Sequence, residues 1–480
     1  MISVIMLNQC RRLFACRITP SVFTCGASFS AGTVQRRIPL PAMSGSGPRF
    51  QCIFAGNRRI PARWFTAPDL TFASPVLMFF FALSVGIQSA KDPVKMTSRI
   101  GVGIIGCGSR VRNLAKGVLA RDPSIRVTAL CDPLPESIVE SRNVLQAQDA
   151  TEYENYHDLV RSDQVDWVMI GSWNRLHKEH AVAAFEAGKH VFCEKPLAVN
   201  LDDCLAIRDA WQRSGKQFII GFTLRYSPHY RKIRELVSGG AIGRIISLEF
   251  NETLSFSHGG YIMGDWRRLR KLAGTHLLEK CCHDLDIANW LLESCVHKAA
   301  SFGGLDFFVP KNAYHMKRLG TDDEGRSAYR TWPGTVLENP FTTEKDILDN
   351  QVAILQYGNG ARATFHTNCN AGIPERRMYI CGTEGAIRSD VRIGRIELQR
   401  IGFDEPLQDL STEGRGGHGG GDSFLTESIA DCMRGNGKPL STLEDGLRAA
   451  IACFGVDAAQ DSGQLFDLSP LWEKAGIELL

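Results

Sequence analysis

Residues Arg99–Asp132 have the sequence RIGVGIIGCGSRVRNLAKGVLARDPSIRVTALCD. The apolar run Ile100–Ile105 is followed at once by Gly106-Cys107-Gly108, and the helical pattern Val111–Arg121 then leads to a second apolar run, Ile125–Leu130. A strand, a glycine turn, a helix and a second strand in this order form the layout of a unit that binds a dinucleotide. The stretch therefore predicts an α/β domain with a parallel sheet and a phosphate-binding turn.

The glycine turn is the main reason for that prediction. Gly106 permits a tight turn, and Gly108 has no Cβ, so a pyrophosphate can come close to the backbone. The helix behind the turn offers free N–H groups and the positive end of its dipole to the anion. An ordinary βαβ unit is the alternative, because Val111 stands where the motif has its third glycine. The predicted cofactor-binding residues of the turn are Gly106, Cys107, Gly108, Ser109 and Arg110.

An acid closes the second strand. Asp132 lies 26 residues after Gly106, where a carboxylate can accept hydrogen bonds from both hydroxyls of a ribose. The same negative charge would repel a 2′-phosphate. The sequence therefore predicts NAD as the cofactor and disfavours NADP.

A length of 480 residues predicts two or three domains of about 150 residues each, and the composition is typical of a globular protein. Nine of the 55 basic residues, all Arg, lie in residues 1–68, which contain no acid, and the remainder carries 46 basic residues against 52 acidic ones. A mildly acidic folded part gives no reason to expect nucleic acid as a partner. The 15 cysteines form no C-x-x-C pair and no zinc spacing, and we interpret them as buried, reduced thiols of an intracellular enzyme.

Residues 1–96 show no domain pattern, and we predict that they are a targeting-like or untranslated extension that is disordered if present. Their Arg-rich, acid-free composition is typical of a transit peptide, whereas the uncharged segment 70–90 resembles the core of a secretory signal and is short for a membrane span. Translation from Met96 is a third possibility and favours a cytoplasmic protein. Use of segment 70–90 would instead favour export or membrane tethering.

The rest of the chain divides into two predicted domains, 97–222 and 223–480. Strand and helix patterns alternate in the first, which indicates a parallel sheet with helices on both faces. In the second, Ile245–Thr253 alternates as a half-buried strand, and the segments around Gly358-Asn359-Gly360 form a hairpin pattern. This part therefore predicts a mostly antiparallel sheet with one face covered.

The segment Glu194-Lys195-Pro196 ends a predicted strand of the parallel sheet. Pro196 keeps Lys195 out of a helical conformation, at the edge of the sheet where such folds bind ligands. An ammonium there could bind a substrate hydroxyl and stabilise an alkoxide. A surface lysine in a loop is the alternative.

A second candidate is the helical segment His276–Leu292, HLLEKCCHDLDIANWLL. On a regular helix, Glu279, His283, Asp286 and Trp290 lie on one face. An acid one turn before a histidine can orient the ring of a general base. A surface helix with an exposed acid–histidine pair is the alternative, and no third ligand with convincing spacing predicts a metal.

A third group contains candidate substrate-binding residues outside these motifs. Arginine and aromatic side chains after the parallel sheet could hold a hydroxylated or anionic substrate, although packing and surface charge would equally explain them. The candidates are Arg225, Tyr226, Trp266 and Arg267, together with His418 in the glycine loop Gly414–Gly421.

Together these segments resemble the Gfo/Idh/MocA family of oxidoreductases. The matching pieces are Gly103–Arg110, the acid Asp132, Gly171–Ala198 with its Glu-Lys-Pro segment, and Leu277–Leu292. The resemblance implies an N-terminal Rossmann domain with a doubly wound parallel sheet, and a C-terminal α/β domain with a large, open, mostly antiparallel sheet. It also implies tight NAD(P) binding, carbohydrate-like substrates, and a homodimer or homotetramer formed face to face by the open sheets.

The resemblance also implies roles for single residues. Lys195 stands at the position of the family's catalytic lysine and His283 at that of its general-base histidine. Glu279, the third catalytic candidate, stands where the family often has Asp, which is one methylene shorter. The loop Ser172–His177, SWNRLH, replaces the common Thr-Pro-x-x-x-His. The further cofactor-binding residues that follow are Ser172, Trp173, Asn174, His177, Glu194 and Lys195.

Three functions fit these observations. The first is an NAD-dependent dehydrogenase that acts on a sugar, inositol or related polyol. The second is a glycosidase or lyase that retains its NAD and works by transient oxidation and elimination, as some relatives with Gly-Gly-His-Gly-Gly loops like Gly416–Gly420 do. The third is a sugar or nucleotide sensor without turnover, which the presence of Lys195 and His283 disfavours.

Overall fold

The computed structural model describes residues 99–331, 338–414 and 418–477. The predicted extension 1–96 lies outside the described residues, as do 415–417 of the glycine loop. In the described ranges, no helix combines the length and the apolar character needed to cross a bilayer.

The first layer is a six-stranded parallel sheet in the order β3-β2-β1-β4-β5-β6, which is the Rossmann arrangement. Its strands are short and apolar, and those at its centre are buried because helices cover both faces. The bounds are β1 Ile100–Ile105, β2 Ile125–Cys131, β3 Thr151–Glu152, β4 Trp167–Ile170, β5 His190–Cys193 and β6 Phe218–Ile220. The helices are α3 Ser109–Arg121, α4 Pro135–Leu145, α5 Tyr156–Arg161, α6 His177–Glu186 and α7 Leu201–Ser214.

The second layer is a nine-stranded sheet in the order β14-β13-β12-β11-β7-β10-β9-β8-β15. Only β7 and β10 pair in parallel, so the sheet is mixed and mostly antiparallel. Strand β9 alternates buried and exposed residues, as expected of a sheet covered on one face. The bounds are β7 Ile245–Thr253, β8 Val296–Gly304, β9 Asn350–Tyr357, β10 Arg362–Asn368, β11 Arg377–Gly382, β12 Gly385–Asp390, β13 Arg395–Arg400, β14 Gln408–Asp409 and β15 Phe466–Asp467.

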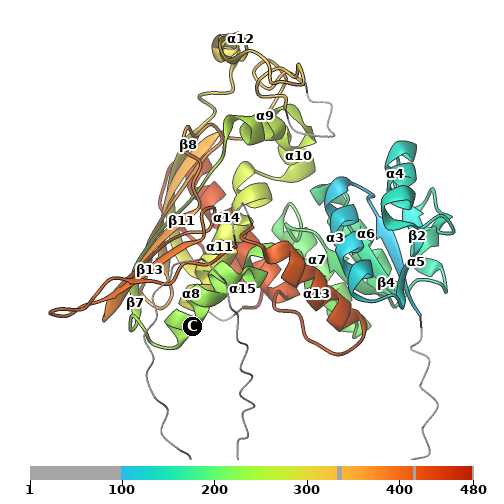
Figure 1. The fold of residues 1–480 in the computed structure, drawn as a ribbon, viewed down its shortest axis with the longest axis horizontal. Helices are drawn as coiled ribbons and strands as arrows, with labels where there is room; N and C mark the ends of the chain where they lie inside the picture. Colours follow the sequence, from blue (N-terminus) through green and yellow to red (C-terminus); the bar gives the residue numbers. More distant parts are fainter. Residues whose placement is uncertain (1–98, 332–337, 415–417, 478–480) are drawn as a thin grey trace, which may run out of the picture. The chain divides into compact units, whose positions relative to one another are not determined.

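Helices α11 Cys282–Leu292 and α14 Leu443–Ser462 pack on the covered face of this sheet (Figure 1). Thr442 and Asp445 form a reciprocal capping box that begins α14. The other helices are α8 Pro228–Ser238, α9 Phe256–Gly264, α10 Arg270–Ala273, α12 Tyr314–Leu319, α13 Gly421–Met433 and α15 Ser469–Lys474.

The apolar core of the parallel-sheet layer is completed from far along the chain. Helix α13 packs against α3, and its residues Leu425, Ile429 and Ala430 join the same buried cluster as Val102 and Val111. The predicted boundary between residues 222 and 223 therefore does not separate two independent cores, since a later segment covers the outer face of α3.

Candidate active site

The glycine turn has an open surface of the kind that a pyrophosphate needs. Gly106 has φ +80°, and a Cβ there would lie 2.3 Å from the backbone nitrogen of Ser172. A Cβ on Gly108 would meet nothing within 4 Å, and Gly108 and Ser109 are exposed. Helix α3 begins here without a side-chain cap and without an acid in its first turn. Its free N–H groups therefore fit the diphosphate of NAD.

Gly171, directly after β4, compensates for the absence of a glycine at position 111. Val111 is fully buried, and a Cβ on Gly171 would lie 2.6 Å from the Val111 Cβ. The close approach that a glycine at position 111 would allow is thus provided by the glycine after β4.

Asp132 lies next to the turn, at the end of β2. Its carboxylate accepts hydrogen bonds from the backbone N–H groups of Cys107, at 2.6 Å, and of Leu134, at 2.8 Å. Burial raises the pKa of Asp132. Each carboxylate oxygen has a second lone pair, so Asp132 can still accept from ribose hydroxyls while it holds the turn.

We expect the substitution Asp132→Asn to weaken the preference for NAD over NADP by about tenfold or more, because it removes the charge that repels a 2′-phosphate and keeps the side-chain shape. Fluorescence titration with both nucleotides measures the ratio of the two dissociation constants. Asp149→Asn, at an exposed position, is the matched control. An unchanged ratio in Asp132→Asn would remove Asp132 from cofactor selection.

The loop after β4 contains residues with different roles. Trp173 is 43% exposed, and Ser172 donates to or accepts from His180 Nδ1 at 2.9 Å. Asn174 is buried, and its Nδ2 donates to the carbonyl of Ala273 at 2.8 Å, so it joins the loop to the second half of the chain. The side chain of Asn174, a predicted cofactor-binding residue, therefore makes a structural contact between the two halves of the chain.

His177 is fully buried and lies between two carbonyl oxygens, Pro196 O at 2.8 Å from Nδ1 and Ser172 O at 3.2 Å from Nε2. Burial lowers its pKa, so the ring is neutral and has one N–H, which the shorter contact assigns to Nδ1. The structure thus places His177 behind the turn that carries Lys195, as a support for it, and does not expose it to a ligand.

Lys195 follows β5 and reaches the acid of the later helical segment. Its Nζ lies 3.3 Å from Glu279 Oε1 and also donates to the backbone carbonyl of Glu279. Arg267 Nε donates to the same Oε1 at 3.1 Å. Lys195, Arg267 and Lys280 together outweigh the effect of burial and hold the pKa of Glu279 well below its usual range. Glu279 is therefore ionised and fixes the lysine ammonium.

His283 is buried on α11, and its ring centroid lies 5.6 Å from that of Phe222 and 5.8 Å from that of His418. Burial, followed by the charge of Lys195, holds its pKa well below the usual value for histidine. Its Nδ1 has no hydrogen-bond partner among the described residues. His283 is thus a neutral imidazole that feels the charge of Lys195, and the neutral ring is the state that can accept a proton.

The predicted pairing of Glu279 with His283 is not what the structure shows. Residues Leu277–Cys281 form a π turn before α11, and this turn changes the rotation of Glu279 relative to the helix. Glu279 contacts Lys195 and Arg267, while further along the helix Asp286 pairs with Arg225. Glu279 and Asp286, which a regular helix would place on one face, therefore contact different parts of the protein.

Arg110 connects the cofactor turn to three distant segments. Its guanidinium donates to Glu194 Oε1 at 2.9 Å, to Thr223 Oγ1 at 2.6 Å and to Asp422 Oδ1 at 2.5 Å. Asp422 Oδ2 in turn lies 3.1 Å from His418 Nδ1. Arg110 and Asp422 therefore connect the glycine turn to the loop that carries His418.

The aromatic candidates form one wall near Lys195. Trp173 and Trp266 stack with ring centroids 5.5 Å apart, across the two halves of the chain. The Arg267 guanidinium lies over Trp266 at 4.4 Å and over Tyr261 at 4.9 Å. Such a wall of aromatic and cationic groups suits a hydroxylated ligand.

Two substrate candidates lie elsewhere. Arg225 is buried and makes a bidentate pair with Asp286, at 2.8 and 2.7 Å. Tyr226 is buried, and its hydroxyl accepts from the backbone nitrogens of Leu440, at 3.0 Å, and Ser441, at 3.3 Å. Both side chains thus make internal structural contacts and do not reach Lys195.

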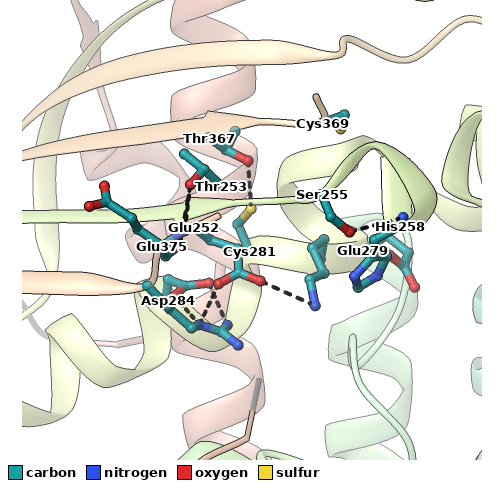
Figure 2. Close-up of polar contacts among 12 residues, drawn as sticks. Glu252, Thr253, Ser255, His258, Glu279, Cys281, Asp284, Thr367, Cys369 and Glu375 are labelled. Carbon is teal, nitrogen blue, oxygen red and sulfur yellow. Dashed lines mark hydrogen bonds and ion pairs between the residues drawn. The ribbon is translucent and has the colours of Figure 1, made fainter. Parts of the chain in front are cut away.

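Sequence reasoning missed a buried ionic cluster beside the site (Figure 2). Glu252 and Asp284 face each other there, and Arg376 bridges them at 2.8 and 2.7 Å. Lys280 Nζ lies 3.3 Å from Glu252. These residues come from separate segments, so no local spacing could reveal the cluster, whereas Asp422 could have been found from its i, i+4 spacing to His418.

Family models match most of the chain. A model described as an oxidoreductase family, NAD-binding Rossmann fold, matches residues 100–222, and one described as the C-terminal alpha/beta domain of an oxidoreductase family matches residues 234–462.

Individual relatives share low sequence identity with the chain. The chain is 28% identical over 238 residues to inositol 2-dehydrogenase/D-chiro-inositol 3-dehydrogenase of Lactiplantibacillus plantarum, covering 49% of this chain and 61% of the relative. It is 26% identical over 293 residues to the 2,7-anhydro-N-acetylneuraminate hydratase of Escherichia coli, covering 61% and 68%. A levoglucosan dehydrogenase solved with NADH and levoglucosan shares the fold at a TM-score of 0.63 and 20% identity, covering 77% of this chain and 99% of that one.

Proposed function

Because the chain belongs to the Gfo/Idh/MocA family of oxidoreductases, we propose that it transfers a hydride between a sugar, inositol or related polyol and NAD. The similarity to inositol and levoglucosan dehydrogenases supports a polyol or sugar as the substrate class. The open glycine turn and Asp132 support NAD as the cofactor.

NAD, when bound, supplies the hydride acceptor. Lys195 Nζ donates a hydrogen bond to the reacting hydroxyl oxygen and stabilises the negative charge that develops on it. His283 accepts the hydroxyl proton, since its ring is neutral. Glu279 acts on Lys195 by holding the ammonium in place.

The observation that carries this proposal is that Lys195 Nζ donates to Glu279, four residues before His283 in the same helical segment. The side chains of Lys195 and His283 come from the end of β5 and from α11, and the lysine charge is among the causes that lower the pKa of the imidazole. A cation that stabilises an alkoxide and a neutral base beside it are the two groups that oxidation of an alcohol requires.

A panel of inositols, aldoses and anhydrosugars tests the proposal. With NAD and a true substrate, absorbance at the NADH wavelength rises, and a substrate deuterated at the reacting carbon slows this rise. No absorbance change across the panel, in protein that binds NAD, would contradict it.

A second candidate is a lyase or glycosidase that retains its NAD, and a specific observation favours it. His418 is oriented by Asp422, at 3.1 Å, and its ring centroid lies 5.8 Å from that of His283. With two histidines at one site, one could accept the proton of the substrate hydroxyl and the other could donate a proton to a leaving oxygen. The similarity to the E. coli hydratase supports a reaction of this kind.

Aryl glycosides and anhydrosugars separate the two functions. Cleavage or hydration without accumulation of NADH, lost in His418→Asn, would support the second candidate. Accumulation of NADH with His418→Asn fully active would exclude it.

The open face of the nine-stranded sheet supports a homodimer. Phe302, Val352 and Ile354 on β8 and β9 are exposed by 68%, 48% and 62%, and monomers rarely expose a contiguous apolar patch of this kind. We expect Ile354→Asp to shift the protein toward the monomer in light scattering coupled to size exclusion. Val139→Asp, at an exposed position on α4, should leave the mass unchanged. An unaltered mass in Ile354→Asp would contradict the expectation.

A further inference from the structure

A cavity of about 280 Å³ lies between α8, α11 and α14 and is lined by none of the catalytic or cofactor residues. Its volume corresponds to roughly nine water molecules at liquid density. One structural water does not fill a space of this size, and the cavity is large enough for a small metabolite. Helices α8, α11 and α14 lie near one another in Figure 1.

Asn289 on α11 is the polar group that most needs a partner in this cavity. It lines the cavity with only 7% exposure, and neither its Oδ1 nor its Nδ2 has a hydrogen-bond partner among the described residues. A buried amide without partners is destabilising. An amide can donate and accept at once. Both polar atoms of Asn289 are inaccessible in this structure, so the side chain has to turn toward the cavity for a ligand with hydroxyl groups to bind them.

The cations of the wall are not equivalent. Arg225 is occupied by a bidentate pair with Asp286, and Arg234 pairs with Glu293. Arg448 on α14 is exposed and makes no ion pair or hydrogen bond with the described residues. It is therefore the one guanidinium of the wall that is available to an incoming anion.

A hydroxyl donor completes the site. Ser294 lines the cavity, and its Oγ accepts from the backbone nitrogen of Asn359 at 3.1 Å, which leaves the O–H free to donate. Asn289, Ser294 and Arg448 thus present an amide, a hydroxyl and a cation to one small space.

We propose that this cavity is a second, non-catalytic binding site for a small anion that also carries hydroxyl groups. Arg448 pairs with the anionic group, while Asn289 and Ser294 bind the hydroxyls. A carboxylate and a phosphate share this chemistry, so sugar acids and sugar phosphates are the two sources. The site does not depend on the reaction proposed for Lys195 and His283.

Calorimetric titration with gluconate, glucose 6-phosphate and uncharged glucose tests the site. We expect at least one of the two anions to bind at least tenfold more tightly than glucose. The variants Asn289→Leu and Arg448→Gln should each weaken this binding at least tenfold. Arg126→Gln, an exposed arginine of β2, is the matched control and should bind as the unaltered protein does.

The variant Lys195→Met separates this site from the active site. Binding that survives in Lys195→Met and is lost in Arg448→Gln supports the second site, and the anion that binds identifies its source. Binding of neither anion, or loss in Lys195→Met with retention in Arg448→Gln, overturns it. Leucine at position 289 removes an unpaired amide, so the melting temperature should not fall, and the exposed Arg448 variant carries the test if Asn289→Leu does not fold.

Discussion

Replacing Lys195 with methionine is expected to lower kcat/KM about 10³-fold and to change the affinity for NAD by no more than a few-fold. Methionine keeps most of the length of the side chain and removes the ammonium, which donates to Glu279 in the structure and to the reacting oxygen in the proposed reaction. Loss of one donor that stabilises a developing oxyanion typically costs 10²–10³-fold. Steady-state kinetics on a substrate found in the panel, together with nucleotide titration, give both quantities.

The control for this variant is Lys116→Met, at an exposed position on α3. It should retain full activity. A decrease of less than tenfold in Lys195→Met would show that the ammonium does not act on the reacting oxygen. A normal kcat/KM with weakened NAD binding would make Lys195 a cofactor ligand only.

The substitution His283→Asn should lower kcat about 10³-fold, within the 10²–10⁴-fold range of a general base, because asparagine keeps the polar shape and cannot take a proton near neutral pH. In the unaltered protein, burial and Lys195 hold the pKa of His283 well below its ordinary value of 6.5. The neutral form is the active one, and it persists as long as the pH exceeds that pKa. We therefore expect no fall in kcat/KM due to His283 between pH 8 and pH 6.5.

Stopped-flow absorbance across this pH range measures the profile. His157→Asn, on the surface of α5, serves as the control. An acidic limb near pH 6.5 to 7 that disappears in His283→Asn would show that the pKa of the base is not depressed. Retention of activity by His283→Asn would remove the residue from the proton transfer.

The parallel sheet could be predicted because its signals are local. The run from Ile100 to Asp132 contains the strand periodicity, the glycine turn and the acid within one unit, and the structure confirms the parallel sheet and the open turn. The role of Gly171 could not be predicted, since its contact with Val111 depends on how two separated segments pack.

The contacts of the candidate-site residues could not be predicted for the same reason. The pattern over 276–292 predicts a regular helix, and the π turn Leu277–Cys281 gives Glu279 a different neighbour from the one that 3.6-residue periodicity predicts. Arginine is a residue type that often binds anionic ligands, yet the guanidinium of Arg225 is paired with Asp286, 61 positions away in the sequence. Spacing along the chain carries no information about such partners.

A structure of the protein with NAD tests the central claim most directly. The diphosphate should lie on the Gly106–Gly108 turn at the start of α3, with the nicotinamide beside Lys195 and His283. A nicotinamide ring remote from both side chains, or failure of the turn to take the nucleotide, would contradict the account.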